Sequence, residues 1–177
     1  MKLSIIICSY DRYKLLARSV AAVGNSKSFD PQIMEIIIVE NTPAARRQGI
    51  STGIECRIVP CDQVGLSHAR NAGIVAALGE IVAFVDDDAL VHDNWCSAVL
   101  AAFQNYPEAE ICGGRTEPLY SSTKRPSWFY QELCFYLSCI NWGPDSHPLK
   151  PGQWIVGANM AFRKAIFDKI GCFDPSL

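Results

Sequence analysis

The sequence predicts an α/β domain built around a mainly parallel β-sheet. Two apolar runs, Leu3 to Ser9 and Ile33 to Glu40, are rich in Ile and lack polar alternation. Such runs are typical of strands that are covered on both faces. Stretches with a helical spacing of apolar residues lie between the predicted strands. An alternation of strands and helices favours a parallel sheet with helices packed on its faces.

The other elements are expected to continue this alternation. Further strands are predicted at 54–59, 80–85 and 110–115, and helices at 12–24, 65–78, 94–105 and 164–170. Asp11 and Asp93 are the expected N-caps of the helices that follow them, because a carboxylate can accept a hydrogen bond from a free backbone N–H. Gly24, Gly79 and Gly171 are the expected helix ends.

Composition excludes several classes of protein. The 177 residues carry 16 Lys and Arg against 18 Asp and Glu, and the net charge of -2 gives no support for a nucleic-acid partner. Apolar residues make up 49% and charged residues 19%, which is enough for a packed core and excludes a disordered chain. No secretory leader and no apolar tract of about 20 residues is found, so we expect a cytoplasmic protein. The eight cysteines lack zinc-finger spacing and are expected to be reduced thiols.

The segment 116–152 differs in composition from the preceding part of the chain, with many Pro, Ser and aromatic residues. Its stretch from Trp128 to Trp142 is compatible with a helix that carries an apolar stripe. One interpretation is that this stripe packs on the core. The other is that 128–142 rests on a membrane or a lipid-linked acceptor, which would place the protein at the inner face of the cell membrane.

Polar clusters follow three of the predicted strands. They are Ser9-Tyr10-Asp11, Glu40-Asn41 and Asp86-Asp87-Asp88. Ligands of parallel α/β sheets bind beyond the carboxyl ends of the strands. The sequence therefore predicts a binding site at this edge.

Three consecutive carboxylates at a strand end repel one another, which raises at least one pKa. A divalent cation removes the conflict, and Mg²⁺ or Mn²⁺ is suited to oxygen ligands that are shared with phosphates. On an extended backbone Asp86 and Asp88 point to one side and Asp87 to the other, so the first and third can face one cation. The alternative is a solvated acidic turn that leads into the next helix.

Five segments in order resemble the family 2 glycosyltransferases, whose fold is the Rossmann-like, three-layer α/β/α fold called GT-A. The matching segments are residues 4–12, 35–41, 65–73, 84–88, and 156–163 together with 171–174. Residues 84–88 resemble the D-x-D motif of the family. Glu40 stands where the family usually has Asp.

The resemblance implies a nucleotide-diphospho-sugar donor, with a UDP-sugar as the first expectation. The nucleotide-binding residues that it implies are Ser9, Tyr10, Arg12, Glu40, Arg70, Asp86 and Asp87. Asp86 and Asp88 would hold Mg²⁺ or Mn²⁺. Gly157, Ala158 and Asn159 would lie on the side of the acceptor, which would be a saccharide or a lipid-linked molecule.

The implied activity is metal-dependent, inverting sugar transfer to an acceptor hydroxyl, in the synthesis of polysaccharide, lipopolysaccharide or another glycan. Residues 1–177 would form a single domain, with a nucleotide-sugar half at 1–115 and a partial acceptor half at 116–177. The family's catalytic base belongs to a Glu-Asp motif that would follow Leu177, so we expect a truncated domain with no catalytic base.

Three alternatives accompany this interpretation. A non-catalytic nucleotide-sugar-binding fragment has the same donor motifs. A phosphohydrolase that uses Asp86 and Asp88 is less expected, because its carboxylates usually follow the first strand. A dinucleotide oxidoreductase is disfavoured, because no G-x-G-x-x-G follows the first strand.

Overall fold

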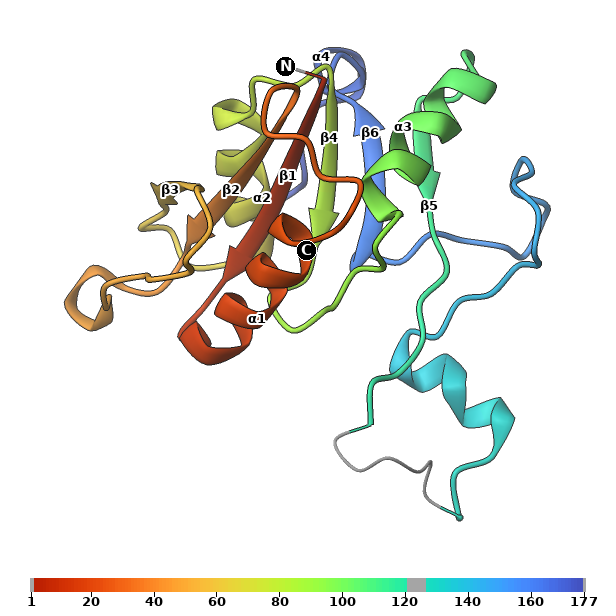
Figure 1. Cartoon of the computed structure of the whole chain (residues 1–177), viewed down its shortest axis with the longest axis horizontal. Coiled ribbons are helices and arrows are strands. Elements are labelled where there is room, and N and C mark those ends of the chain that lie inside the picture. Colours follow the sequence, from red (N-terminus) through yellow and green to blue (C-terminus); the bar gives the residue numbers. More distant parts are fainter. Residues whose placement is uncertain (1, 121–126, 177) are drawn as a thin grey trace.

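A computed structural model describes residues 2–120 and 127–176 and confirms the predicted α/β class (Figure 1). Its six-stranded sheet has the order β3-β2-β1-β4-β6-β5. The strands are β1 (Leu3–Ser9), β2 (Met34–Glu40), β3 (Arg57–Pro60), β4 (Ile81–Val85), β5 (Ile111–Gly113) and β6 (Asn159–Arg163). The α-helices are α1 (Tyr13–Gly24), α2 (Leu66–Ala76), α3 (Trp95–Asn105) and α4 (Ile166–Ile170), and 3₁₀ turns span Ala44–Arg46 and Gln131–Leu137. Strand β1 is parallel to β2 and β4, β2 is parallel to β3, and β6 is antiparallel to both β4 and β5.

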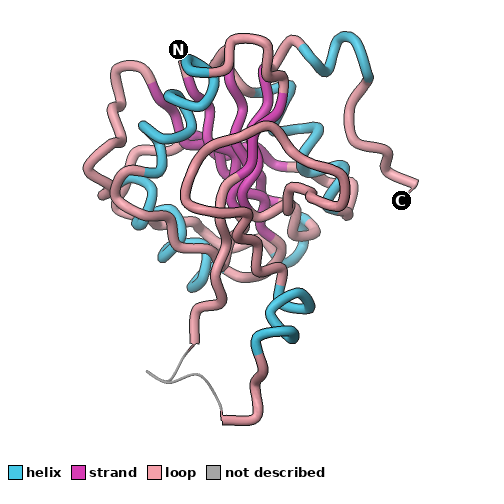
Figure 2. The backbone as a smooth tube through the Cα atoms, turned by 90° about the vertical axis from the view of Figure 1, so that its right-hand side faces the viewer, coloured by secondary structure: helices cyan, strands magenta, loops and turns pink. Residues whose placement is uncertain are grey.

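Helices cover both faces of the sheet, so the predicted three layers are present (Figure 2). Helices α1 and α3 pack on one face with Ile5 and Ile7, whereas α2 and α4 pack on the other with Ile6. Successive side chains of a strand point to opposite faces. A strand of consecutive Ile residues therefore serves both cores, which explains the unbroken apolar run that the sequence shows.

Both N-cap predictions were wrong. Asp11 lies outside α1 with a φ of 56°, and its backbone N–H donates to Thr42 Oγ1 at 2.9 Å. Asp93 lies outside α3 and forms a 2.8 Å ion pair with Lys27. Arg12 and Asn94 occupy the cap positions, and neither makes a capping side-chain bond. The Asp11 carboxylate pairs with Arg46 at 3.3 Å and that of Asp93 pairs with Lys27, and neither partner can be inferred from the local sequence.

The connection between β5 and β6 leaves the sheet and returns to it (Figure 1). A bridge between Thr116 and Ile140 closes the base of this excursion. The α-helix expected at 128–142 is instead the shorter 3₁₀ stretch Gln131–Leu137. Phe129 and Ile140 are buried, as expected if the apolar stripe packs on the protein core. Trp128, Tyr130 and Tyr136 are 67–80% exposed, as expected if the segment rests on a membrane or a lipid-linked acceptor.

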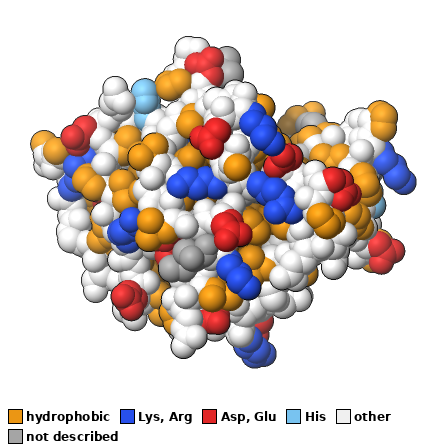
Figure 3. All heavy atoms as spheres, turned by 90° about the horizontal axis from the view of Figure 1, so that it is seen from above, with side chains coloured by type: hydrophobic (Ala, Val, Ile, Leu, Met, Phe, Trp, Pro, Cys, Tyr) orange, Lys and Arg blue, Asp and Glu red, His pale blue; other side chains and the backbone are white. Residues whose placement is uncertain are grey.

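The face at the amino end of the sheet shows basic and acidic side chains interspersed, and no basic patch gathers among the described residues there (Figure 3). Within 2–120 and 127–176, no helix is long and apolar enough to cross a bilayer. The eight cysteines are free thiols.

Helix α2 approaches the sheet closely at Gly73. A Cβ atom there would lie 2.5 Å from Cγ2 of Ile6 and 3.2 Å from Cγ2 of Val39. A glycine at this position brings α2 near β1 and β2, and α2 carries part of the site described below.

We expect Gly73→Val to lower the free energy of unfolding by about 1–3 kcal/mol, because the added methyl groups overpack a filled core. Gly49→Val is the matched control, since nothing lies within 4 Å of a Cβ at that position. Urea unfolding followed by circular dichroism measures both. Equal stability losses in the two variants would contradict the close approach of α2.

Candidate functional site

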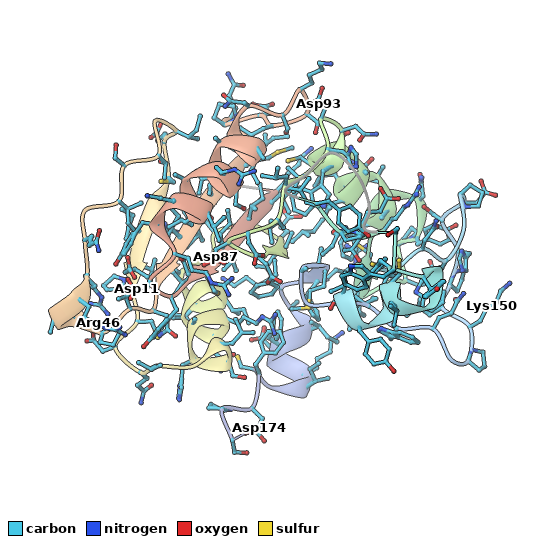
Figure 4. All side chains as sticks on the ribbon, turned by 90° about the horizontal axis from the view of Figure 1, so that it is seen from below. Asp11, Arg46, Asp87, Asp93, Lys150 and Asp174 are labelled. Carbon is cyan, nitrogen blue, oxygen red and sulfur yellow. The ribbon has the colours of Figure 1, made fainter. Side chains whose placement is uncertain are left out.

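The polar clusters predicted from the sequence do meet at one edge of the sheet. Strands β1, β2 and β4 are parallel and end at Ser9, Glu40 and Val85. Figure 4 looks at this edge and shows Asp87 and Asp11 on it, with Arg46 to the side.

Asp87 is the most deeply buried member of the aspartate trio, with 6% of its surface exposed. Its Oδ2 accepts a 2.8 Å hydrogen bond from the Ser9 hydroxyl, and its Oδ1 lies 3.2 Å from Arg12 Nη1. The same nitrogen donates to Asp88 Oδ2 at 2.9 Å. Arg12, which was expected to contact the nucleotide, therefore pairs with both Asp87 and Asp88, and its single positive charge offsets part of their combined negative charge.

Asp86 has a different environment. Burial raises the pKa of its carboxyl group, and the neighbouring Asp88 and Asp87 raise it further, whereas Arg70 and Arg12 lower it. No hydrogen bond reaches this carboxylate from the part of the chain that the structure describes. The repulsion expected among the three carboxylates thus remains at Asp86.

The backbone turns directly after β4, because Ala89 N–H donates to Asp86 O at 3.1 Å. The extended geometry assumed for Asp86 to Asp88 is therefore wrong, and strand alternation does not decide where Asp88 points. Within residues 2–120 and 127–176 no three His, Cys, Asp or Glu side chains gather as cation ligands. A cation at this site would need oxygens from a bound molecule or from water.

A cleft of about 300 Å³ lies beside the aspartates. Its lining residues are Cys8, Ser9, Tyr10, Asn41, Val64, Gly65, Leu66 and Ala69. Ser9 and Tyr10 were predicted as site residues and are found there. Most of the other walls are apolar, which suits the flat face of an aromatic ring system.

Asn41 belongs to the polar cluster predicted after β2, but the sequence suggested no role for it. Its Nδ2 donates to the carbonyl oxygens of Cys61 at 3.0 Å and Gln63 at 2.8 Å, and its Oδ1 accepts the Gly65 N–H at 2.9 Å. Both the nitrogen and the oxygen of the Asn41 side-chain amide are therefore hydrogen-bonded within the protein. Asn41 therefore fixes the loop that forms one wall of the cleft.

Glu40 is only 3% exposed. Its Oε1 accepts the Thr42 N–H at 3.1 Å, but its buried Oε2 has no hydrogen-bond partner among the described residues. Buried polar atoms are almost always paired. The unpaired oxygen marks Glu40 as a residue with capacity for an additional donor.

Arg46 was not predicted as a site residue. Its guanidinium carbon lies 5.3 Å from the centre of the Tyr10 ring, its Nη2 donates to the Tyr10 hydroxyl, and its Nη1 pairs with Asp11 at 3.3 Å. It lies 36 residues after Tyr10, so only the tertiary fold joins them.

Arg70 approaches the aspartates from α2. Its positive charge opposes the upward shift in the pKa of Asp86. A Cβ on Gly157 would lie 2.5 Å from Arg70 Nη2, so the small residue leaves room for the guanidinium.

Gly157, Ala158 and Asn159, which were expected on the acceptor side, have different surroundings in the structure. Gly157 adjoins Arg70, and Ala158 is half-buried beside it in the chain. The Asn159 amide is engaged internally: Oδ1 accepts the Trp95 indole N–H at 2.9 Å and Nδ2 donates to Arg115 O at 3.1 Å. Asn159 thus has a structural role that its sequence motif does not reveal.

Asp174 is a poor candidate for a general base. Hydrogen bonds from the Ser176 N–H and hydroxyl lower the pKa of its carboxyl group. A general base works best when its pKa lies near the working pH.

Comparison with known proteins identifies the family. The model of glycosyl transferase family 2 matches residues 4–171. The chain belongs to glycosyl transferase family 2. The resemblance inferred from the five sequence segments is therefore confirmed.

Curated relatives include glycosyltransferases from archaea and bacteria. A glucosyl-dolichyl phosphate glucuronosyltransferase of Haloferax volcanii is 26% identical over 99% of this chain and 57% of its own length. An uncharacterised glycosyltransferase of Nostoc, alr2836, is 31% identical over 59% of this chain and 33% of its own. The chain thus spans a little over half the length of the first relative and a third of the second.

Solved structures confirm the GT-A fold. TarS 1–349 of S. aureus in complex with UDP superposes with a TM-score of 0.68 and 15% identity, over all of this chain and 51% of that one. The mannosyltransferase PcManGT of Pyrobaculum calidifontis, in complex with GDP-Man and Mn²⁺, gives a TM-score of 0.64 and 16% identity, over 99% and 48%.

We expect Ser9→Ala to lower the free energy of unfolding by about 1–3 kcal/mol, because it removes a hydrogen bond from a buried carboxylate. Ser97→Ala is the matched control: Ser97 is exposed and donates only to the Asn94 carbonyl. Its stability should change by no more than about 0.5 kcal/mol. Urea unfolding of both variants tests this, and an unaffected Ser9→Ala protein would show that Asp87 does not depend on Ser9.

We expect Asp86→Asn to raise the melting temperature at pH 7 in the presence of EDTA. The folded-state pKa lies above the ordinary value of 3.8, so the charged carboxylate opposes folding at neutral pH. As the pH falls through the raised pKa and then through 3.8, the wild-type carboxyl group becomes protonated in both states. The stability gain of the variant should then disappear.

Thermal melts between pH 7 and pH 3 measure this difference. Asp145→Asn, at an exposed position, is the matched control. An Asp86→Asn protein that is no more stable than wild type at pH 7 would contradict the unfavourable charge at Asp86.

Proposed function

We propose that this domain is the donor-binding part of an inverting glycosyltransferase. It would move a sugar, as a hexosyltransferase does, from a nucleotide-diphospho-sugar to an acceptor hydroxyl with the help of Mg²⁺ or Mn²⁺. A UDP-sugar is the first candidate donor. The observation that carries the proposal is the incompletely compensated carboxylate of Asp86 at the carboxyl end of β4, beside a largely apolar cleft and two arginines.

The nucleoside would occupy the cleft formed by Ser9, Tyr10 and the 61–66 loop. Apolar walls suit the faces of a base, and the ring of Tyr10 is held in place by Arg46. The unpaired Oε2 of Glu40 could accept a hydrogen bond from a base N–H or a ribose hydroxyl. TarS and PcManGT, which share the fold, bind UDP and GDP-Man.

The residues at the end of β4 fit a hard divalent cation. Asp86 offers a carboxylate without a hydrogen-bond partner in the described structure, and the Asp88 side chain is 50% exposed. A cation shared by these oxygens and a diphosphate would remove the unfavourable charge that raises the pKa of Asp86. When bound, it would supply positive charge that stabilises the diphosphate leaving group.

The protein's own cations would complete the donor site. Arg70 lies near Asp86 with its guanidinium free of hydrogen bonds and ion pairs within the described residues. It could therefore donate to phosphate oxygens, for which its planar fork is suited. Arg12 offsets part of the negative charge of Asp87 and Asp88, and so weakens the repulsion between these carboxylates and an anionic donor.

The acceptor half would be 116–177 together with a segment after Leu177. The proton of the acceptor hydroxyl would pass to a carboxylate base in that later segment, while the oxygen attacks the anomeric carbon opposite the leaving group. A lipid-linked acceptor is in keeping with the name of the Haloferax relative. The exposed rings of Trp128, Tyr130 and Tyr136 would then face lipid at the inner side of the membrane, in the synthesis of a polysaccharide or another glycan.

We expect UDP or GDP to bind at least about tenfold more tightly with Mn²⁺ than with EDTA, because the cation offsets the charges of Asp86 and the diphosphate. Asp88→Ala should abolish this difference. Asp145→Ala replaces an exposed aspartate of the excursion and should retain it. Isothermal titration calorimetry gives both affinities.

The proposal fails if neither nucleotide binds the wild-type chain, or if Mn²⁺ leaves the affinity unchanged. If a nucleotide does bind, sugar transfer and donor hydrolysis are assayed on this chain and on one extended beyond Leu177. Binding without turnover in either chain would favour a non-catalytic nucleotide-sugar-binding module.

A further inference from the structure

A pair of hydrogen bonds links α2 to the segment that follows α4. Asn71 Nδ2 donates to Phe173 O at 2.8 Å, and Phe173 N–H donates to Asn71 Oδ1 at 2.9 Å. The two residues are 102 positions apart in the sequence. The side-chain amide thus pairs with the donor and the acceptor of one residue, which fixes the position and orientation of Phe173.

The ring of Phe173 is the centre of an aromatic cluster. It meets Phe84 edge to face at 5.6 Å between ring centres and Phe162 at 6.1 Å, and it also contacts Phe167 at 6.0 Å. Phe84 lies in β4 two residues before Asp86. The cluster therefore connects the segment after α4 to the strand that carries the aspartates.

Arg70 lies against this cluster. Its guanidinium carbon is 5.2 Å from the centre of the Phe173 ring and 5.8 Å from that of Phe84. Gly157 approaches Nη2 so closely that a Cβ there would be 2.5 Å away. Two rings and a glycine thus hold the guanidinium, while no protein acceptor among the described residues takes its N–H groups.

This environment holds a cation without using its donors. Contact with an aromatic face stabilises a guanidinium by electrostatic attraction and leaves its edge free. The Phe173 ring forms one side of the space that holds the Arg70 guanidinium. Asn71, the next residue in the helix, sets where that side lies.

We propose that Asn71 is a positioning residue of the donor site. By clamping the backbone of Phe173, it keeps the ring against Arg70 and so directs the guanidinium toward the diphosphate. The inference rests on the proposed function for the identity of the ligand. It adds that the segment after α4, expected to serve the acceptor, also sets the geometry of donor binding.

The test compares Asn71→Ala with Asn105→Ala, an exposed asparagine at the end of α3. UDP and GDP are titrated with Mn²⁺ by calorimetry, and the nucleotide that wild type binds is then compared with its nucleoside. Asn71→Ala should weaken the diphosphate about tenfold, the size expected for one misplaced charge-assisted hydrogen bond. The affinity for the nucleoside should be unchanged, and Asn105→Ala should match wild type for both.

Two further measurements separate positioning from a loss of stability. In the Arg70→Ala background, Asn71→Ala should cause no additional loss, because the two residues act on the same contact. The ¹H–¹⁵N resonance of Arg70 Nε–H, assigned by its disappearance in Arg70→Lys, should shift in Asn71→Ala as the Phe173 ring moves. The same resonance should stay in place in Asn105→Ala.

The outcomes distinguish this inference from the function on which it rests. If wild type binds neither nucleotide, the proposed function is overturned and the role of Asn71 with it. If wild type binds, the inference alone is overturned by an unchanged diphosphate affinity in Asn71→Ala. Equal losses for nucleoside and diphosphate, additive losses in the double variant, or an unshifted Arg70 resonance would each overturn it as well.

Discussion

The burial of the Asp87 carboxylate is the constraint on which this edge of the sheet depends. A buried carboxylate without partners would cost several kcal/mol. Ser9 at the end of β1 and Arg12 at the start of α1 supply the partners. The end of β4 is thereby tied to the junction of β1 and α1. Residues 75 and more positions apart in the sequence act as one unit.

Two other acidic side chains at this edge are not fully paired. Asp86 keeps a carboxylate whose pKa is raised by burial, and Glu40 keeps an unpaired oxygen. Sequences normally satisfy every buried polar group, and departures from this rule concentrate at functional sites. Asp86 and Glu40 lie at the carboxyl ends of parallel strands, where ligands of α/β sheets bind, whereas Ser28 Oγ, which also lacks a partner within the described residues, lies in the loop after α1. The family assignment and the unfavourable local electrostatics therefore point to the same edge by independent routes.

The two halves of the domain share elements more closely than their order in the chain suggests. Strand β6 pairs with β4, and the residues after α4 return to α2 through Asn71. Gly157 and Phe173, from the half assigned to the acceptor, form walls around Arg70. In the donor site that we propose, the position of Arg70 would thus depend on segments that the sequence places far from the nucleotide motifs. The excursion from β5 to β6, by contrast, exposes aromatic side chains on a part of the chain that extends beyond the sheet.

The sequence by itself determined the layers, most of the strands and the edge of the sheet at which the polar clusters meet. Consecutive Ile residues in β1 and β2 fit only strands buried on both faces, and the polar residues that end those strands must meet at one edge. Only the tertiary structure decided which groups compensate one another. Asp11 pairs with Arg46 and does not cap α1, Arg12 pairs with the aspartates, and Asn41 and Asn71 bond to partners distant in the chain. Hydrophobic periodicity is a local property that can be read along a sequence, whereas the pairing of polar groups depends on distances that exist only after the chain has folded.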